Sequence, residues 1–393
     1  MNASGYQLPE ELKMIQTAVR KFIAEEIVPL ERQLDPEAIE LSRADYDRLS
    51  QKAKEAGMWC MGEPAAYGGG GLGCFAMTVV GEEMSQHRNG LYRPAYGVFG
   101  PSGYTAPGIP PIIYEGTKEQ IEKYAIRTIR EGHTAFFALT EPSGGSDPAR
   151  SVQTRAVKDA DGWIINGTKS FITGADTAAW GVAFARTAPY EKGRVGLTCF
   201  IVETGMPGFS TRLVPVIRPW YPCEVTFEDC RIPSGNVLGQ VGEGFELAAK
   251  CMGKGRCTYS AANLGVAVAA QRLAIEYSKQ RVVFGEALSR KQAVQWMLAD
   301  GDVEIRAARW LIWDAAWKVE RGEEHRHEVS AAKLYSSEVL GRVVDRAVQI
   351  HGGYGVSKEL PLERWYREAR IRRIGEGPSE VHRMVISRDL LRG

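Results

Sequence analysis

The chain has 393 residues, 44% of them hydrophobic, and its 49 basic and 48 acidic residues leave a net charge of +1. This length allows two or three domains around a sizeable core, and the near-neutral charge gives no reason to expect nucleic acid or an anionic membrane as a partner. The seven cysteines are scattered without a Cys-x-x-Cys pair, which argues against a disulfide framework and against a zinc site.

The sequence contains no signal for export or membrane insertion. Residues 1–6 lack the basic and then apolar pattern of a secretory signal. The longest near-apolar stretch, 266–270, is far too short to span a bilayer. We therefore expect a cytoplasmic protein.

The first third of the chain is predicted to be helical. Apolar residues recur on one helical face over 8–29, and the spacing returns at 42–56, 77–86 and 118–129. The glycine-rich loop at 63–73 lacks the Lys-Ser/Thr pair of a P-loop and does not open a Rossmann βαβ unit. We interpret that loop as a flexible turn.

Near His133 the pattern changes to short strands. Apolar runs are separated by Gly, Pro, Asn and Asp, with turn signals at 159–162 and 166–167. Such punctuation is typical of a compact β barrel or sandwich. The predicted strands are 135–139, 153–158, 162–166, 180–185, 197–202, 209–213 and 225–227.

Long helical patterns return after Gly244, where glycine and proline become sparse. Four such patterns are best packed as an antiparallel bundle. They cover 245–280, 290–321, 329–351 and 361–373.

The order of these patterns predicts a multidomain α+β fold. We expect an N-terminal helical domain at 1–133, a middle β-barrel domain at 134–245 and a C-terminal four-helix bundle at 246–393.

The most informative stretch for chemistry is 374–379. Glu376 stands between Gly375 and Gly377, and Pro378 follows. Glycine permits unusual backbone angles and proline begins a helix well, so the carboxylate is predicted to lie in a tight break between two helices. The alternative is an ordinary turn with a solvated glutamate.

Four further stretches suit a polar ligand, because small residues let a ligand approach the backbone and hydroxyls offer it donors. They lie at 139–147, 166–175, 281–292 and 349–355. Each alone is weak evidence, since such a stretch is usually only a turn and a single arginine is usually a surface charge.

Together, in this order, the five stretches resemble the acyl-CoA dehydrogenase family over nearly the whole chain. The resemblance implies that family's three-domain fold, assembled as a homotetramer. It implies FAD as the cofactor, a CoA thioester as the substrate and electron-transferring flavoprotein as the electron acceptor.

The resemblance implies FAD contacts from two groups of residues. Contacts near the flavin ring and the phosphates fall on Phe137, Leu139, Thr140, Gly145, Ser146, Phe171, Ile172 and Thr173. Phe171 stands where the family usually has Trp. Contacts with the FAD of a neighbouring subunit, and with the adenosine end, fall on Arg281, Phe284, Gln292, Gln349, Gly352 and Gly353.

For catalysis, the resemblance implies that Glu376 is the base that removes the α-proton of the substrate. Some members place the base at a position that is Gly255 here, so Glu376 has no rival there. Ser146 and Arg256 are implied to lie along the pantetheine path. The predicted reaction converts an acyl-CoA into a 2-enoyl-CoA, with the β-hydrogen leaving as hydride to flavin N5.

Two departures from the family pattern flank the base. The family's aromatic residue before the base is Gly375 here, which is expected to widen the acyl pocket. The family's Gly-Thr after the base is Gly377-Pro378 here, which removes one hydroxyl and one N–H near the flavin.

A last feature concerns the acyl group. Arg93, which follows Gly90-Leu91-Tyr92, resembles the arginine that faces a substrate carboxylate in the glutaryl-CoA dehydrogenase branch, and a guanidinium suits that task. The alternative is that Arg93 pairs with a structural acid. The expected substrates are therefore branched, cyclic, aryl or dicarboxylic acyl-CoAs. An oxidase that uses O2 and a catalytically silent flavoprotein scaffold remain alternative functions.

Overall fold

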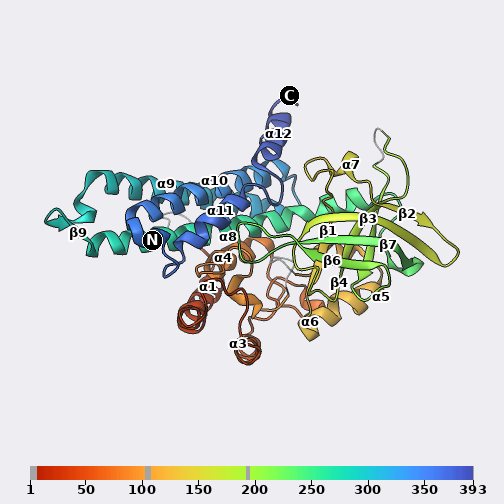
Figure 1. The fold of residues 1–393 in the computed structure, drawn as a ribbon, viewed down its shortest axis with the longest axis horizontal. Coiled ribbons are helices and arrows are strands. Elements are labelled where there is room, and N and C mark those ends of the chain that lie inside the picture. The colour runs from red at the N-terminus through yellow and green to blue at the C-terminus, as the bar shows by residue number, and fades with distance from the viewer. Residues whose placement is uncertain (1–6, 102–107, 192–194, 393) are drawn as a thin grey trace. The chain divides into compact units, whose positions relative to one another are not determined.

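The structure, a computed structural model, describes residues 7–101, 108–191 and 195–392 (Figure 1). It confirms the predicted order of N-terminal helices, a middle sheet and C-terminal helices. The expectation about a signal at residues 1–6 falls outside the described residues.

The chain divides into two compact units. The first, here called the bundle unit, contains the residues up to 58, 72–98 and those from 256 onward. The second, here called the sheet unit, contains 59–71 and 99–255. The first helices and the C-terminal helices thus share one unit, and the boundary at 255 lies inside a long helix.

The N-terminal helices of the bundle unit follow the predicted apolar spacing. α1 (Glu10–Phe22) continues through a π-helical turn (Ile23–Ile27) into α2 (Val28–Glu31). α3 (Arg43–Glu55) is capped by the preceding residue, Ser42, whose hydroxyl oxygen accepts a hydrogen bond from the N–H of Asp45. The mostly buried α4 (Cys74–Met84) contacts α1 and α9.

The C-terminal helices form the bundle that the sequence predicted (Figure 1). α10 contacts α9, α11 and α12, and the short β9–β10 hairpin joins α8 to α9. No helix of the described residues is long and apolar enough to cross a membrane. The bounds are α8 (Gly244–Gln280), β9 (Val282–Val283), β10 (Glu286–Ala287), α9 (Gln292–Glu320), α10 (Arg326–His351), α11 (Leu362–Arg372) and α12 (Ser379–Leu390).

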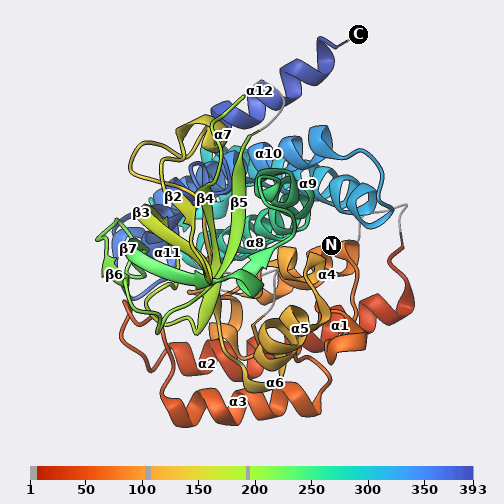
Figure 2. The ribbon, with the colours of Figure 1, turned by 90° about the vertical axis from the view of Figure 1, so that its right-hand side faces the viewer.

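The sheet unit is built on one mixed sheet with the order β6-β7-β3-β2-β4-β5-β8, and β1 also pairs with β4, in parallel. Figure 2 shows its strands fanning out, as expected for the twist of a β-sheet. The bounds are β1 (Ala135–Ala138), β2 (Arg155–Lys158), β3 (Gly162–Ile172), β4 (Trp180–Arg186), β5 (Leu197–Glu203), β6 (Phe209–Leu213), β7 (Cys223–Pro233) and β8 (Val237–Leu238).

The turn predicted at 166–167 is wrong, because β3 continues through it. Its pairing with β7 shifts register between Ile165 and Gly167, and Gly167 has a φ of +147°. A Cβ at Gly167 would lie 2.5 Å from the hydroxyl oxygen of Thr154. Glycine therefore serves a bulge with a close backbone approach instead of a chain reversal.

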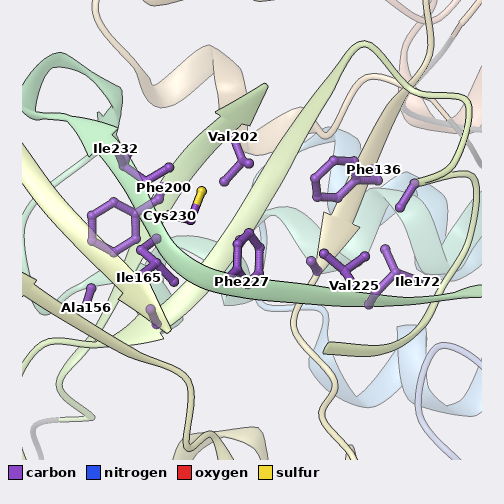
Figure 3. Close-up of a cluster of buried hydrophobic side chains, with 14 of the residues drawn as sticks. Phe136, Ala156, Ile165, Ile172, Phe200, Val202, Val225, Phe227, Cys230 and Ile232 are labelled. Carbon is purple, nitrogen blue, oxygen red and sulfur yellow. The ribbon is translucent and has the colours of Figure 1, made fainter. Parts of the chain in front are cut away.

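Both faces of the sheet are buried. On one face, aromatic and branched side chains including Phe136, Phe200 and Phe227 form a cluster (Figure 3). On the other face, the π-helical turn Ile121–Ile126 and the helix α6 (Arg127–Glu131) that follows it contribute to a second cluster. Two-sided burial explains why the central strands are almost continuously apolar.

The basic, aromatic run in α11 holds segments of the bundle unit together. Arg364 is buried, and its Nε donates to Oε1 of Glu368 at 3.0 Å. The same guanidinium donates to the carbonyl oxygens of Pro36 and Ala38, at 3.2 and 3.0 Å, and to Oδ1 of Asn89 at 2.6 Å. One side chain thus joins α11 to two N-terminal segments.

We predict that Arg364→Met lowers the free energy of unfolding by about 3–5 kcal/mol, because the buried Glu368 loses its cation. Arg370→Met is the matched control, since Arg370 is exposed on the same helix, and its effect should stay within about 0.5 kcal/mol. Urea unfolding followed by circular dichroism measures both, and equal midpoints for the two variants would contradict the prediction.

Candidate active site

The segment between α11 and α12 makes the predicted break. α11 ends at Arg372, and α12 begins at Ser379 directly after Pro378. Glu376 has a φ of +58°, in the left-handed region that non-glycine residues rarely adopt, and Gly377 follows at +92°. Such a residue costs about 1–3 kcal/mol and persists only where its surroundings enforce the conformation.

Three side chains from three helices hold the carbonyl groups of this segment. Nε of Arg256 (α8) and Nε2 of His382 (α12) donate to the carbonyl oxygen of Glu376 at 3.2 and 3.1 Å. Nζ of Lys333 (α10) donates to the carbonyl oxygen of Gly377 at 2.6 Å. Two consecutive peptide groups are therefore fixed in orientation.

Burial lowers the pKa values of these groups. The pKa of Lys333 falls to about 7, mainly through burial and then through Arg372, while Glu376 acts to raise it. Burial, followed by Arg256 and Lys333, lowers the pKa of His382 to about 3, so its ring is neutral and donates through Nε2. Burial also lowers the pKa of Arg256, which stays charged.

The carboxylate of Glu376 is exposed and makes no hydrogen bond or ion pair with the residues described by the structure. Its backbone is rigid, yet its acceptor oxygens are unengaged. A carboxylate presented in this way can take a proton from a ligand bound against it.

Gly375 packs against α8. A Cβ at this position would lie 2.8 Å from the hydroxyl oxygen of Tyr259, closer than real Cβ contacts. The ring of Tyr259 lies under the guanidinium of Arg372, 3.1 Å from the ring centroid, and Arg372 also donates to Asn263 and to the carbonyl of Leu91. The hydroxyl of Tyr259 therefore borders the space that Gly375 was expected to leave open.

Arg93 has an acidic partner. Its Nη1 lies 3.1 Å from Oε1 of Glu40. This pair favours the structural alternative for Arg93 over a contact with a substrate carboxylate.

Two of the predicted cofactor-binding stretches lie side by side in the sheet unit. The N–H of Ser170, near the end of β3, donates to the carbonyl oxygen of Thr140, in the loop after β1, at 2.9 Å. Phe171 follows with a φ of +60° and a side chain that is 59% exposed. A strained, exposed aromatic ring beside a hydroxyl-bearing loop fits a flat ring such as that of flavin.

A buried ion pair fixes that loop. Nζ of Lys169 lies 2.7 Å from Oε1 of Glu141, and both side chains are buried. Glu141 also accepts the N–H groups of Gln153 and Thr154, at 2.6 and 3.0 Å. Burial lowers the pKa of Lys169 to about 8.

The other predicted cofactor residues gather where α8 and α10 end. Tyr277 stacks on His351 with ring centroids 4.4 Å apart, which brings these two helix ends together. Phe284, in the hairpin after α8, is 98% exposed and has a φ of +50°. All the residues predicted here are exposed, namely Arg281, Phe284, Gln292, Gln349, Gly352 and Gly353. Such exposure suits contact with a partner or ligand.

Besides the set at the ends of α8 and α10, the predicted site residues fall in two places. Arg256, Gly375, Glu376 and Gly377 come together in the bundle unit. The residues predicted for the flavin ring belong to the sheet unit, namely Phe137, Leu139, Thr140, Gly145, Ser146, Phe171, Ile172 and Thr173.

Sequence reasoning missed Lys333, His382 and Tyr259. One signal was present for Lys333, because Val329, at i−4 on the same helical face, and Leu340, at i+7, are buried apolar residues. A lysine on an apolar helical face indicates a functional or paired charge. His382 and Tyr259 carried no comparable signal.

Comparisons with known proteins match the order of the three parts. Family models described as acyl-CoA dehydrogenase N-terminal, middle and C-terminal domains match residues 9–131, 136–230 and 242–391. The acryloyl-CoA reductase (NADH) of Anaerotignum propionicum is 35% identical over 405 residues, covering 100% of this chain and 97% of its own. The acyl-CoA dehydrogenase of Bacillus subtilis is 36% identical over 387 residues, covering 98% and 99%. The structure of butyryl-CoA dehydrogenase from Megasphaera elsdenii aligns with a TM-score of 0.86 and 32% identity over 100% of both chains.

The contact between Gly375 and Tyr259 gives a testable prediction. Gly375→Ala should destabilise the protein by about 1–3 kcal/mol, because the added methyl group overlaps the Tyr259 hydroxyl. In a Tyr259→Phe background this cost should largely vanish, since the next Tyr259 atom, Cζ, lies 3.7 Å away. Thermal unfolding of the two single variants and the double variant measures the coupling. Additive effects would mean that the two side chains do not compete for this space.

Proposed function

Because the chain belongs to the acyl-CoA dehydrogenase family, whose members are FAD-dependent oxidoreductases, we propose that it oxidises an acyl-CoA thioester to the 2-enoyl-CoA with Glu376 as the catalytic base. The observation that carries this proposal is the unengaged carboxylate of Glu376, held on a left-handed backbone by Arg256, Lys333 and His382.

The base must reach a weakly acidic C–H bond. A hydrogen α to a thioester is acidic only because the enolate oxygen can be stabilised as the proton leaves, so base and donors must be in place beforehand. Glu376 takes the proton, and its own N–H is proposed to donate to the thioester oxygen.

In this proposal the contacts with one FAD come from two copies of the chain. FAD, when bound, accepts the electrons removed from the substrate. Phe171 and Thr173 of one chain would hold its ring, and the loop at 140–146 would hold its polar groups. Arg281 and Phe284 would reach the FAD of a neighbouring copy, as expected in a homotetramer.

The contacts of Gly375 and Arg93 limit which acyl groups we expect the site to accept. Gly375 has no side chain to place beside the base, and the hydroxyl oxygen of Tyr259 is the nearest atom to the space that a Cβ would take, at 2.8 Å among the described residues. Arg93 already pairs with Glu40. It would therefore bind a substrate carboxylate more weakly than an unpaired arginine would. We therefore favour a neutral branched, cyclic or aryl acyl group over a dicarboxylic one.

A second candidate is the same chemistry in reverse. The relative from Anaerotignum propionicum is named as a reductase that uses NADH, and one base can return the proton that it removes. Anaerobic mixing of the chemically reduced enzyme with acryloyl-CoA would detect this activity as flavin reoxidation.

The electron acceptor in the forward direction is proposed to be electron-transferring flavoprotein. An oxidase would instead reoxidise its reduced flavin rapidly in air, and a silent scaffold would show no flavin reduction by any acyl-CoA. Reoxidation rates with and without electron-transferring flavoprotein, after anaerobic reduction by substrate, separate the three cases.

We predict that the purified protein is yellow and that its flavin is bleached at least tenfold faster by isobutyryl-CoA or 3-phenylpropionyl-CoA than by glutaryl-CoA. Octanoyl-CoA serves as the straight-chain comparison. The measurement is the flavin absorbance after anaerobic mixing. Fastest bleaching by glutaryl-CoA, abolished by Arg93→Ala, would refute this account of the acyl site and leave the dehydrogenase proposal intact.

We also predict that Glu376→Gln retains FAD and binds acyl-CoA, yet reduces its flavin about 10²–10⁴-fold more slowly than the wild type. Glutamine preserves shape but cannot accept the proton. Stopped-flow flavin reduction gives the rate, and a spectral titration gives binding. A near-normal rate in this variant would place the base elsewhere.

A further inference from the structure

A lysine inside the bundle takes no part in the proton transfer described so far. The side chain of Lys333 is fully buried in the middle of α10. Its Nζ donates to the carbonyl oxygen of Gly377 at 2.6 Å and lies 5.9 Å from the ring centroid of Tyr259. A buried ammonium is costly, so a lysine at such a position requires compensation from particular groups.

We propose that Lys333 is a positioning residue for the base: from α10 it holds the carbonyl of Gly377 and thereby keeps Glu376 in its left-handed conformation. This inference rests on the proposed role of Glu376. The peptide group between Glu376 and Gly377 is held through the oxygen of Glu376, and the next peptide group, between Gly377 and Pro378, is held through the oxygen of Gly377. Neither peptide group can turn without breaking a hydrogen bond, so the backbone on the C-terminal side of Glu376 is fixed by these three donors.

Lys333 differs from the other two donors in how it holds the loop. Arg256 and His382 both donate to the oxygen of Glu376, so each partly duplicates the other. Among the described residues, the side chain that donates to the carbonyl oxygen of Gly377 is that of Lys333. Loss of Lys333 should therefore free the peptide group between Gly377 and Pro378, whereas loss of Arg256 or of His382 leaves one donor on the oxygen of Glu376.

The charge of Lys333 is sensitive to its surroundings. Arg256 and Tyr259 on α8, Arg372 on α11, His382 on α12 and Glu376 in the loop face it from four segments, and Glu338 lies further along α10. Because the pKa of Lys333 is lowered to about 7, the ammonium loses its proton as pH rises through neutrality. The charge-assisted bond to Gly377 then becomes an ordinary, weaker hydrogen bond.

The experiment compares the wild type with Lys333→Met, which removes the charge at nearly constant shape, and Lys333→Arg, which keeps a charged donor. Lys318→Met is the matched control, since Lys318 also lies in the bundle but pairs with Glu328, which is outside the 373–379 loop. Each holoenzyme is studied by hydrogen exchange of peptides covering that loop. Anaerobic flavin reduction is then followed from pH 6 to 9 with the acyl-CoA that bleaches the wild type fastest.

For Lys333→Met we expect at least tenfold faster exchange in the loop and 10–100-fold slower flavin reduction, with acyl-CoA affinity within twofold of the wild type. The wild-type rate should decline above about pH 7 and this decline should be absent in Lys333→Met. Lys333→Arg should recover much of the rate and move the decline above pH 9. Lys318→Met should behave as the wild type.

Unchanged loop exchange and rate in Lys333→Met would overturn the inference while leaving the proposed function standing, because the wild type would still be reduced. If no acyl-CoA reduces the wild type, the proposed function fails, and the exchange data alone decide whether Lys333 holds the loop. If Lys333→Met does not fold, Lys333→Arg decides: an alkaline decline at the wild-type pH in that variant would overturn the inference.

Discussion

Buried cations that must be fully partnered are the constraint on which the bundle unit depends. Burying an unpaired charge is far costlier than burying a methylene group, so each such group fixes its partners in place. Arg364 fixes two N-terminal segments on α11, Arg372 fixes α11 on α8, and Lys333 fixes the loop beyond α11 on α10. The apolar core alone would permit small slides between helices, whereas these hydrogen bonds do not.

Three predicted functional positions have a strained backbone. Among the described non-glycine residues with positive φ are Glu376, Phe171 and Phe284, each singled out before for a ligand or the base. Bulky residues adopt this conformation only where the fold compels it. The strained backbone at these positions lowers the stability of the fold, and it directs a carboxylate and two aromatic rings outward. Side chains held in place in this way suit the proposed catalysis and cofactor binding.

Much of the architecture was predictable because it depends on periodicity. The long helices and most strands follow apolar spacing, and the break at Glu376 follows its flanking glycines and proline. What failed depended on tertiary contacts. The Asn166-Gly167 pair is typical of a turn, yet close approach of Thr154 makes it a bulge. Likewise, the pair of Arg93 with Glu40 and the approach of Tyr259 to Gly375 join residues far apart in sequence, and spacing carries no information about such pairs.

The bundle unit combines segments from both ends of the chain. This arrangement affects how the chain folds while it is being synthesised. α4 buries Phe75, Met77, Val79 and Val80, and it packs against α9, which begins only at Gln292. A ribosome takes on the order of ten to forty seconds to translate the roughly 200 residues between these two helices. During that time α4 exposes an apolar surface without its final partner, whereas the last strand of the sheet unit, β8, is complete at Leu238, before α9 begins. The nascent chain is therefore expected to need chaperone protection for its first hundred residues more than for its middle.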